Sequence, residues 1–149
     1  MNLILEINNP SGCNFDEKKL KLTVEKTINK TKWADFFVGE ISISVGFVSE
    51  EAIRKINKQY RKKDYPTDIL SFANFNSEDD LLSSKENNIF LGELIICFED
   101  ISKYCKKNKI SFDKEFYKVF SHGILHLLGY GHGQKMFQIQ KEVSLEISE

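Results

Sequence analysis

The chain has 149 residues, of which 41% are hydrophobic and 29% are charged, and its formal net charge is −1. This length and composition predict one packed globular domain over residues 1–149 and exclude a disordered chain. The near-neutral total argues against a protein that binds polyanions through its overall charge, although lysines and arginines crowd residues 54–63 and 103–109.

Cysteine usage and the distribution of apolar residues indicate where the protein works. The cysteines Cys13, Cys97 and Cys105 are odd in number and form no CxxC pair, so we interpret them as small buried hydrophobic residues rather than disulfides or metal ligands. No apolar run is long enough to span a membrane, and residues 3–7 are too few for a signal sequence. We therefore expect a cytoplasmic protein without a membrane partner.

The first half of the chain alternates strand and helix patterns. Apolar residues recur every four positions within residues 16–29 and every second position within residues 40–48, which are the periods of a helix and of a half-buried strand. Ser49 is a plausible N-cap for the helix that follows. The predicted elements are a strand at 3–7, a helix at 16–29, a strand at 40–48, a helix from 50 to about 60, and a strand at 68–75.

The second half is predominantly helical. The polar segment 76–88 is predicted to be a flexible loop, and Ser111 is expected to cap the long helix that follows it. The remaining predicted elements are a strand at 89–97 and helices at 99–108, 111–128 and 135–147. This order predicts an α+β domain in which a small mixed sheet of about four strands packs against five or so helices.

All three histidines fall in one short segment, which is the strongest chemical signal in the chain. His122 and His126 are four residues apart, so they share one face of the predicted helix. Gly129 can end that helix with a positive φ and return the chain so that His132 joins them. Three imidazoles leave one position of a tetrahedral zinc ion open, as in catalytic sites, and we expect one zinc per chain. A structural zinc site would need a fourth protein ligand.

The same segment overlays the zinc-protease pattern H-E-x-x-H-x-x-G-x-x-H with one change. Gly123 stands where those proteases carry the glutamate that acts as general base. The pattern therefore keeps the metal ligands and lacks the base of ordinary peptide hydrolysis. Either close helix packing or room for a substrate would explain a glycine here.

Two further stretches extend the pattern to most of the chain. Residues 61–72 read R-x-K-D-x-P-T-D-x-L-S-F, residues 91–93 read L-G-E, and the histidine segment reads H-G-x-L-H-L-x-G-Y-x-H. Together they resemble the YbeY family of bacterial endoribonucleases. The resemblance implies a zinc-like metal on His122, His126 and His132, and hydrolysis of single-stranded RNA. It also implies a role in maturing the 3′ end of small-subunit ribosomal RNA and in ribosome quality control, with RNA and the small subunit as partners and no DNA.

The family's functional arginine corresponds to Arg61. A guanidinium is always charged and its planar fork matches phosphate oxygens, so Arg61 could stabilise charge that develops on a scissile phosphate. Taken without the resemblance, Arg61 could equally be the end of a basic helix. The chain departs from the family pattern at Gly131, where an acidic residue is usual, and in the short connection after His132.

These observations lead to one main hypothesis and two alternatives. The main hypothesis is a metal-dependent endoribonuclease in which metal-activated water or the RNA 2′-hydroxyl attacks the phosphodiester, with Arg61 stabilising the phosphate. The alternatives are a zincin-like metallopeptidase and a non-catalytic, ribosome-associated RNA-binding module with a structural metal. Asp68 is interpreted as part of a turn, and Glu93 is given no catalytic role.

Overall fold

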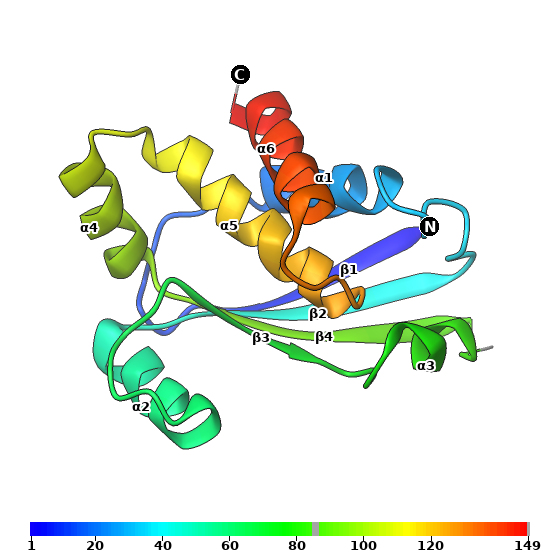
Figure 1. The fold of residues 1–149 in the computed structure, drawn as a ribbon, viewed down its shortest axis with the longest axis horizontal. Helices are drawn as coiled ribbons and strands as arrows, with labels where there is room; N and C mark the ends of the chain where they lie inside the picture. The colour runs from blue at the N-terminus through cyan, green and yellow to red at the C-terminus, as the bar shows by residue number, and fades with distance from the viewer. Residues whose placement is uncertain (85–86, 149) are drawn as a thin grey trace.

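The computed structural model describes residues 1–84 and 87–148, which form a mixed sheet with helices on both of its faces (Figure 1). The strands are β1 (Asn2–Asn8), β2 (Glu40–Phe47), β3 (Ile69–Ala73) and β4 (Asn88–Ile96). The helices are α1 (Glu17–Asn29), α2 (Glu50–Arg61), α3 (Glu78–Leu82), α4 (Phe98–Asn108), α5 (Phe112–Leu127) and α6 (Gln134–Ser148). The predicted α+β domain with a small mixed sheet is confirmed.

The strand order is β1-β2-β4-β3, so β3 lies at one edge of the sheet. β1 and β2 are parallel, β2 and β4 are parallel, and β3 runs antiparallel to β4. Figure 1 shows α1, α5 and α6 over one face of the sheet and α2 over the other. The antiparallel edge strand β3 contacts α5, the helix that carries His122 and His126.

Helix α5 is the centre of the larger hydrophobic core. Most of its surface is buried against the sheet, α1 and α6, and Phe120, Ile124 and Leu125 are completely enclosed. A smaller cluster beneath α2 includes Ile53 and Leu70. The buried side of α5 is mostly apolar and packs against these elements, so the position of the helix is fixed by packing.

The helix starts follow local capping chemistry. The side chains of Ser49 and Ser111 accept hydrogen bonds from the amides of Ala52 and Lys114, as predicted for N-caps. These bonds satisfy amides that have no partner within the helix. The expected starts of α2 and α5 are therefore confirmed.

The segment predicted to be a flexible loop contains a short helix instead. Ser77 caps α3, three acidic residues occupy its first turn, and Leu81 is buried in the core. The acidic composition misled the prediction because a single buried leucine anchors the segment. The prediction for residues 85 and 86 falls outside the described part of the chain.

Two smaller predictions are also corrected. β3 is shorter than the predicted strand at 68–75. Cys97 and Cys105 are buried as expected, whereas Cys13 is partly exposed because it lies in the turn after β1, where the Asn9 side chain accepts a hydrogen bond from its amide. In the part of the chain that the structure describes, no helix has the length and apolarity needed to cross a membrane.

A β-bulge in β4 lets the sheet approach α5 closely. The register of β2 against β4 shifts after Ser42, and Gly92 at this point has a φ of 142°. A Cβ atom on Gly92 would collide with the carbonyl oxygen of Phe72 and lie 2.9 Å from the Leu127 side chain. Only glycine fits this backbone, because both the dihedral angle and the available space exclude a side chain.

We predict that Gly92→Ala lowers the free energy of unfolding by about 2–4 kcal/mol, because it combines backbone strain with overpacking. Chemical denaturation followed by circular dichroism measures the change. The matched control is Gly131→Ala, where a Cβ atom would meet nothing within 4 Å. Equal stability of the two variants would show that the bulge does not need glycine.

Candidate metal centre

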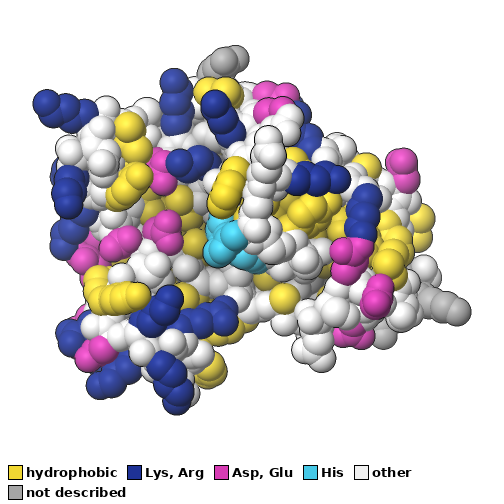
Figure 2. Space-filling view, in the orientation of Figure 1, with side chains coloured by type: hydrophobic (Ala, Val, Ile, Leu, Met, Phe, Trp, Pro, Cys, Tyr) yellow, Lys and Arg dark blue, Asp and Glu magenta, His cyan; other side chains and the backbone are white. Residues whose placement is uncertain are grey.

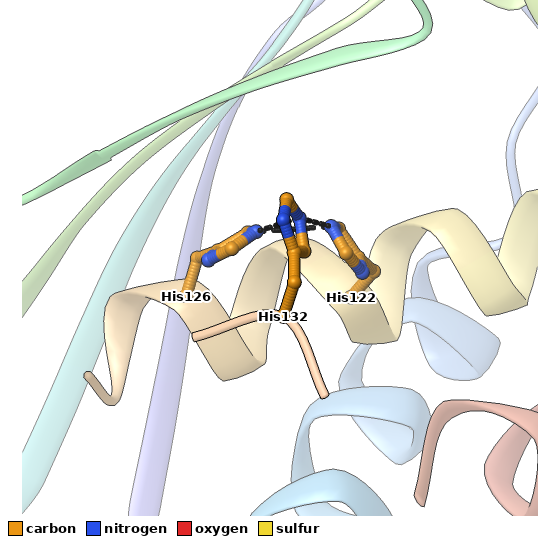
Figure 3. Close-up of side chains that lie close together, drawn as sticks. All are labelled: His122, His126 and His132. Atoms are coloured by element: carbon orange, nitrogen blue, oxygen red, sulfur yellow. Dashed lines mark hydrogen bonds between the residues drawn. The ribbon is translucent and has the colours of Figure 1, made fainter. Parts of the chain in front are cut away.

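The three histidine rings converge on one point beside α5, as Figure 3 shows. His122 and His126 project from successive turns of the helix, and His132 reaches them from the connection to α6. The Nε2 atoms of His122 and His126 are 2.9 Å apart, and the Nε2 atom of His132 lies 3.2 Å from His126 and 3.3 Å from His122. The spacing predicted from sequence is confirmed.

The end of α5 explains how His132 returns. Gly129 has a φ of 93°, its amide donates to the carbonyl of His126, and the amide of Tyr130 donates to the carbonyl of Leu125. These bonds close the helix and turn the chain back along its own face. The predicted role of Gly129 is therefore confirmed.

The hydrogen bonds behind two of the rings fix which nitrogen carries the proton. The Nδ1 atom of His126 is 3.1 Å from the carbonyl oxygen of Tyr130, and the Nδ1 atom of His122 is 2.8 Å from Oε1 of Gln140. Because these oxygens only accept hydrogen bonds, both Nδ1 atoms must be donors. In the neutral rings the Nε2 atoms then carry lone pairs, and these lone pairs point toward each other.

This arrangement fits a metal ion. With both Nδ1 atoms acting as donors, the Nε2 lone pairs of neutral His122 and His126 face the same point, 2.9 Å apart, where both can bind a cation. In a tetrahedral zinc site with Zn–N bonds of about 2.0–2.1 Å, ligand nitrogens are about 3.3 Å apart. The distances observed are close to that value, and neutral imidazole is a common zinc ligand.

Among the described residues, the cluster that could hold a metal comprises only these three histidines, with no cysteine or carboxylate as a fourth member. The group therefore has the donor set of an open site, in which one position is left for water or substrate, rather than that of a closed structural site.

Electrostatics keeps the central ring neutral. Burial lowers the pKa of His126 from its ordinary value, and the neighbouring His122 lowers it further. The contact with the Tyr130 carbonyl acts in the opposite direction, and Arg61 contributes a smaller lowering. A neutral imidazole is the form that binds a metal, so these effects favour a site that can be loaded near neutral pH.

The histidines form part of the wall of a cleft of about 720 Å³. The opposite wall comes from the end of α2, the following loop and β3, and its polar side chains include Arg61, Lys63 and Asp68. In Figure 2, lysine and arginine side chains lie both above and below the histidine cluster. The cleft therefore combines a metal-binding group with cationic side chains, which suits an anionic substrate.

Arg61 lines this cleft and contacts the edge strand β3. Its Nη2 atom donates a hydrogen bond to the carbonyl oxygen of Ser71 at 2.9 Å, and its guanidinium lies 5.5 Å from the centre of the Phe72 ring. Both partners belong to the edge strand β3. Since one of the five N–H donors is used in this contact, the others are available for a ligand.

The loop between α2 and β3 is held in place on α2. Asn57 is 3% exposed and donates from its side chain to the carbonyl of Tyr65, and Arg54 pairs with Asp64 at 2.8 Å. The Arg54 guanidinium lowers the pKa of the Asp64 carboxyl. These contacts determine where the loop side chains enter the cleft.

Two carboxylates and one glycine singled out in the sequence have structural explanations. The Asp68 side chain accepts hydrogen bonds from the Ile69 amide and the Thr67 hydroxyl, so it bonds locally as expected, although its carbonyl accepts from the Cys97 amide where β3 pairs with β4 and no turn forms there. Glu93 is exposed on β4. A Cβ atom on Gly123 would lie 2.6 Å from the Ile69 side chain. Close packing against the sheet therefore accounts for this glycine, and its position leaves no room for a catalytic glutamate.

The residues behind the metal site were not predicted from the sequence. Gln140 comes from α6 and is 9% exposed, and its contact with His122 joins residues 18 positions apart. The available signal was a polar residue among the mostly apolar buried positions of α6, which include Met136, Ile139 and Val143. Glu115 and Lys118, which form an ion pair at 2.9 Å beside the cleft, were also missed.

Comparisons with known proteins agree with this geometry. The family model described as endoribonuclease YbeY matches residues 6–147. Endoribonuclease YbeY of Lactobacillus acidophilus is 38% identical over 154 residues, covering 91% of this chain and 84% of that protein. The protein of the same name from Fusobacterium nucleatum is 42% identical over 118 residues, covering 79% and 70% of the two chains.

A solved structure has the same fold. The solution structure of TM1509 from Thermotoga maritima aligns with a TM-score of 0.61 and 30% identity, covering 97% of this chain and 89% of that one.

We predict that Gln140→Met weakens zinc binding about 10–100-fold, because the Nδ1 proton of His122 loses its acceptor and the ring is no longer held in the binding tautomer. Competition with a chromophoric chelator measures the affinity. The control is Gln140→Glu, which keeps an acceptor at the same place and should bind zinc at least as tightly as the wild type. Equal losses in both variants would show that the contact has no orienting role.

Proposed function

The chain belongs to the YbeY endoribonuclease family, and on this basis we propose that residues 1–149 act as a single metal-dependent endoribonuclease domain specific for single-stranded RNA. His122, His126 and His132 hold one zinc ion, and Arg61 binds the phosphate at which the strand is cut. The substrate is the 3′ region of small-subunit ribosomal RNA, and the protein works in the cytoplasm with the small subunit.

One observation carries this proposal. Three imidazole Nε2 atoms meet within 3.3 Å of one another on the wall of the cleft that also contains Arg61. An open metal site facing an oriented guanidinium is a combination suited to phosphodiester chemistry, because both groups stabilise negative charge on phosphate oxygens.

The residues around the cleft have separate roles in this proposal. When bound, the metal would supply Lewis acidity at the phosphodiester. Gln140 and the Tyr130 carbonyl keep the ligand rings in the correct tautomer. Arg61 is preorganised by Ser71 and Phe72, so it can form a charge-assisted contact with phosphate without first losing side-chain freedom.

The cleft supports RNA rather than peptide as the substrate. Position 123 holds a glycine packed against the sheet, so the general base of the zinc proteases is missing. Lys63 lines the cleft together with Arg61 and provides a cationic contact for a phosphate backbone. The ribosomal role and the cytoplasmic location rest on family membership, and the unpaired cysteines fit a reducing compartment.

We predict that zinc-loaded protein cleaves labelled single-stranded RNA and leaves a duplex of the same sequence intact. His126→Ala should lower kcat/KM at least about 10²–10³-fold because a metal ligand is lost, and Arg61→Ala should lower it by a similar factor because transition-state charge is no longer stabilised. Gel analysis of timed reactions measures the rates, and Lys106→Gln on the surface of α4 is the control.

Chelation should abolish cleavage, and added zinc should restore it. Unchanged cleavage by both His126→Ala and Arg61→Ala would identify a contaminating nuclease and contradict the proposal. Turnover of peptides with zinc fully bound would instead support a metallopeptidase.

A further inference from the structure

A stripe of basic residues leads along α5 into the metal site. Lys114, Lys118, His122 and His126 follow one another at intervals of four residues, so each lies one helical turn from the next. Each step advances about 6 Å along the helix axis, which is similar to the distance between successive phosphates in an extended nucleic-acid strand. Two lysines therefore precede the two helical histidines on successive turns of α5.

The lysines of this stripe line a second cavity of about 390 Å³ between α5 and α6, which we call the α5–α6 groove. Its α6 side includes Lys141 and Leu145. Glu115 and Lys118 line both this groove and the cleft that contains the histidines. The groove is therefore a continuation of the cleft rather than a separate site.

The charge of the groove is positive. Lys118 neutralises Glu115 through an ion pair at 2.9 Å. Lys114 and Lys141 have exposed side chains and form no ion pair with any residue that the structure describes. Two cationic side chains thus remain for an anionic ligand after the internal pair is formed.

The groove also offers apolar surface at its end. Ile110, just before α5, is 42% exposed, and Leu145 on α6 is 41% exposed. Both line the groove. Apolar side chains beside cationic ones suit a single-stranded nucleic acid, whose unpaired bases and phosphates can contact both kinds of surface at once.

We propose that the α5–α6 groove binds the phosphate backbone of the single-stranded RNA flank that leaves the metal cleft, with Lys114 and Lys141 each contacting a phosphate. The inference rests on the proposed function, since it extends the path of the same substrate. The groove then sets how much RNA beside the cleavage point the protein holds, independently of base sequence.

The test measures the salt dependence of binding by the double variant Lys114→Gln/Lys141→Gln. Fluorescence anisotropy follows zinc-loaded protein with a labelled 2′-O-methyl single-stranded RNA long enough to cover both cleft and groove, and a gel checks that the RNA stays intact. Losing two phosphate contacts should make the slope of log affinity against log salt shallower by about 1.4. Between about 50 and 200 mM salt, wild-type affinity should then fall about sevenfold more than that of the variant.

The matched control is Lys106→Gln/Lys107→Gln, which removes the same charge from exposed positions on α4. It should keep the wild-type slope. A short RNA that spans only the cleft should bind the groove variant and the wild type with the same slope. Equal slopes for the two double variants on the long RNA would overturn the inference.

Cleavage of ordinary RNA by the same wild-type preparation separates the two proposals. If the wild type cleaves RNA and the groove variant keeps the wild-type slope, the proposed role of the groove is wrong and the proposed endoribonuclease function is supported. If the wild type cleaves no RNA but the groove variant shows the shallower slope, the groove binds RNA and the proposed catalytic function is wrong.

Discussion

The metal-binding geometry of this protein depends on the Nε2 lone pairs of His122 and His126, whose nitrogen atoms lie 2.9 Å apart. The carbonyl of Tyr130 and the side chain of Gln140 hold the Nδ1 protons of His126 and His122, so the Nε2 lone pairs of the neutral rings are free to bind a cation. The elements around the site serve to hold the rings in this position. Helix α5 is buried along its apolar side, and the glycines Gly92 and Gly123 let it lie directly on the sheet.

The same packing brings a second element to the site. Edge strand β3 lies against α5, and its Ser71 carbonyl and Phe72 ring fix Arg61 at the end of α2. The guanidinium therefore reaches the histidine cleft through contacts with backbone and ring rather than through an ion pair. Among the described residues Arg61 forms no ion pair with a carboxylate, so its guanidinium can pair with a phosphate ligand, which connects the fold to the chemistry of the family.

The parts of the site encoded over short distances could be predicted from sequence. His122 and His126 lie one helical turn apart, and Gly129 reverses the chain within the same segment, so local rules were sufficient for the triad. The contact between Gln140 and His122 could not be predicted, because it depends on how α6 packs on α5. Arg61 was found by resemblance, whereas its orientation depends on β3. The short helix α3 was missed because one buried side chain, Leu81, outweighs the polar composition of its segment.

The central claim is that three imidazoles form an open zinc site, and X-ray absorption at the zinc edge of zinc-loaded protein tests it most directly. The account predicts three nitrogen ligands at about 2.0–2.1 Å with the multiple scattering typical of imidazole, together with one oxygen ligand. A sulfur ligand at about 2.3 Å, or fewer than three imidazoles, would contradict it.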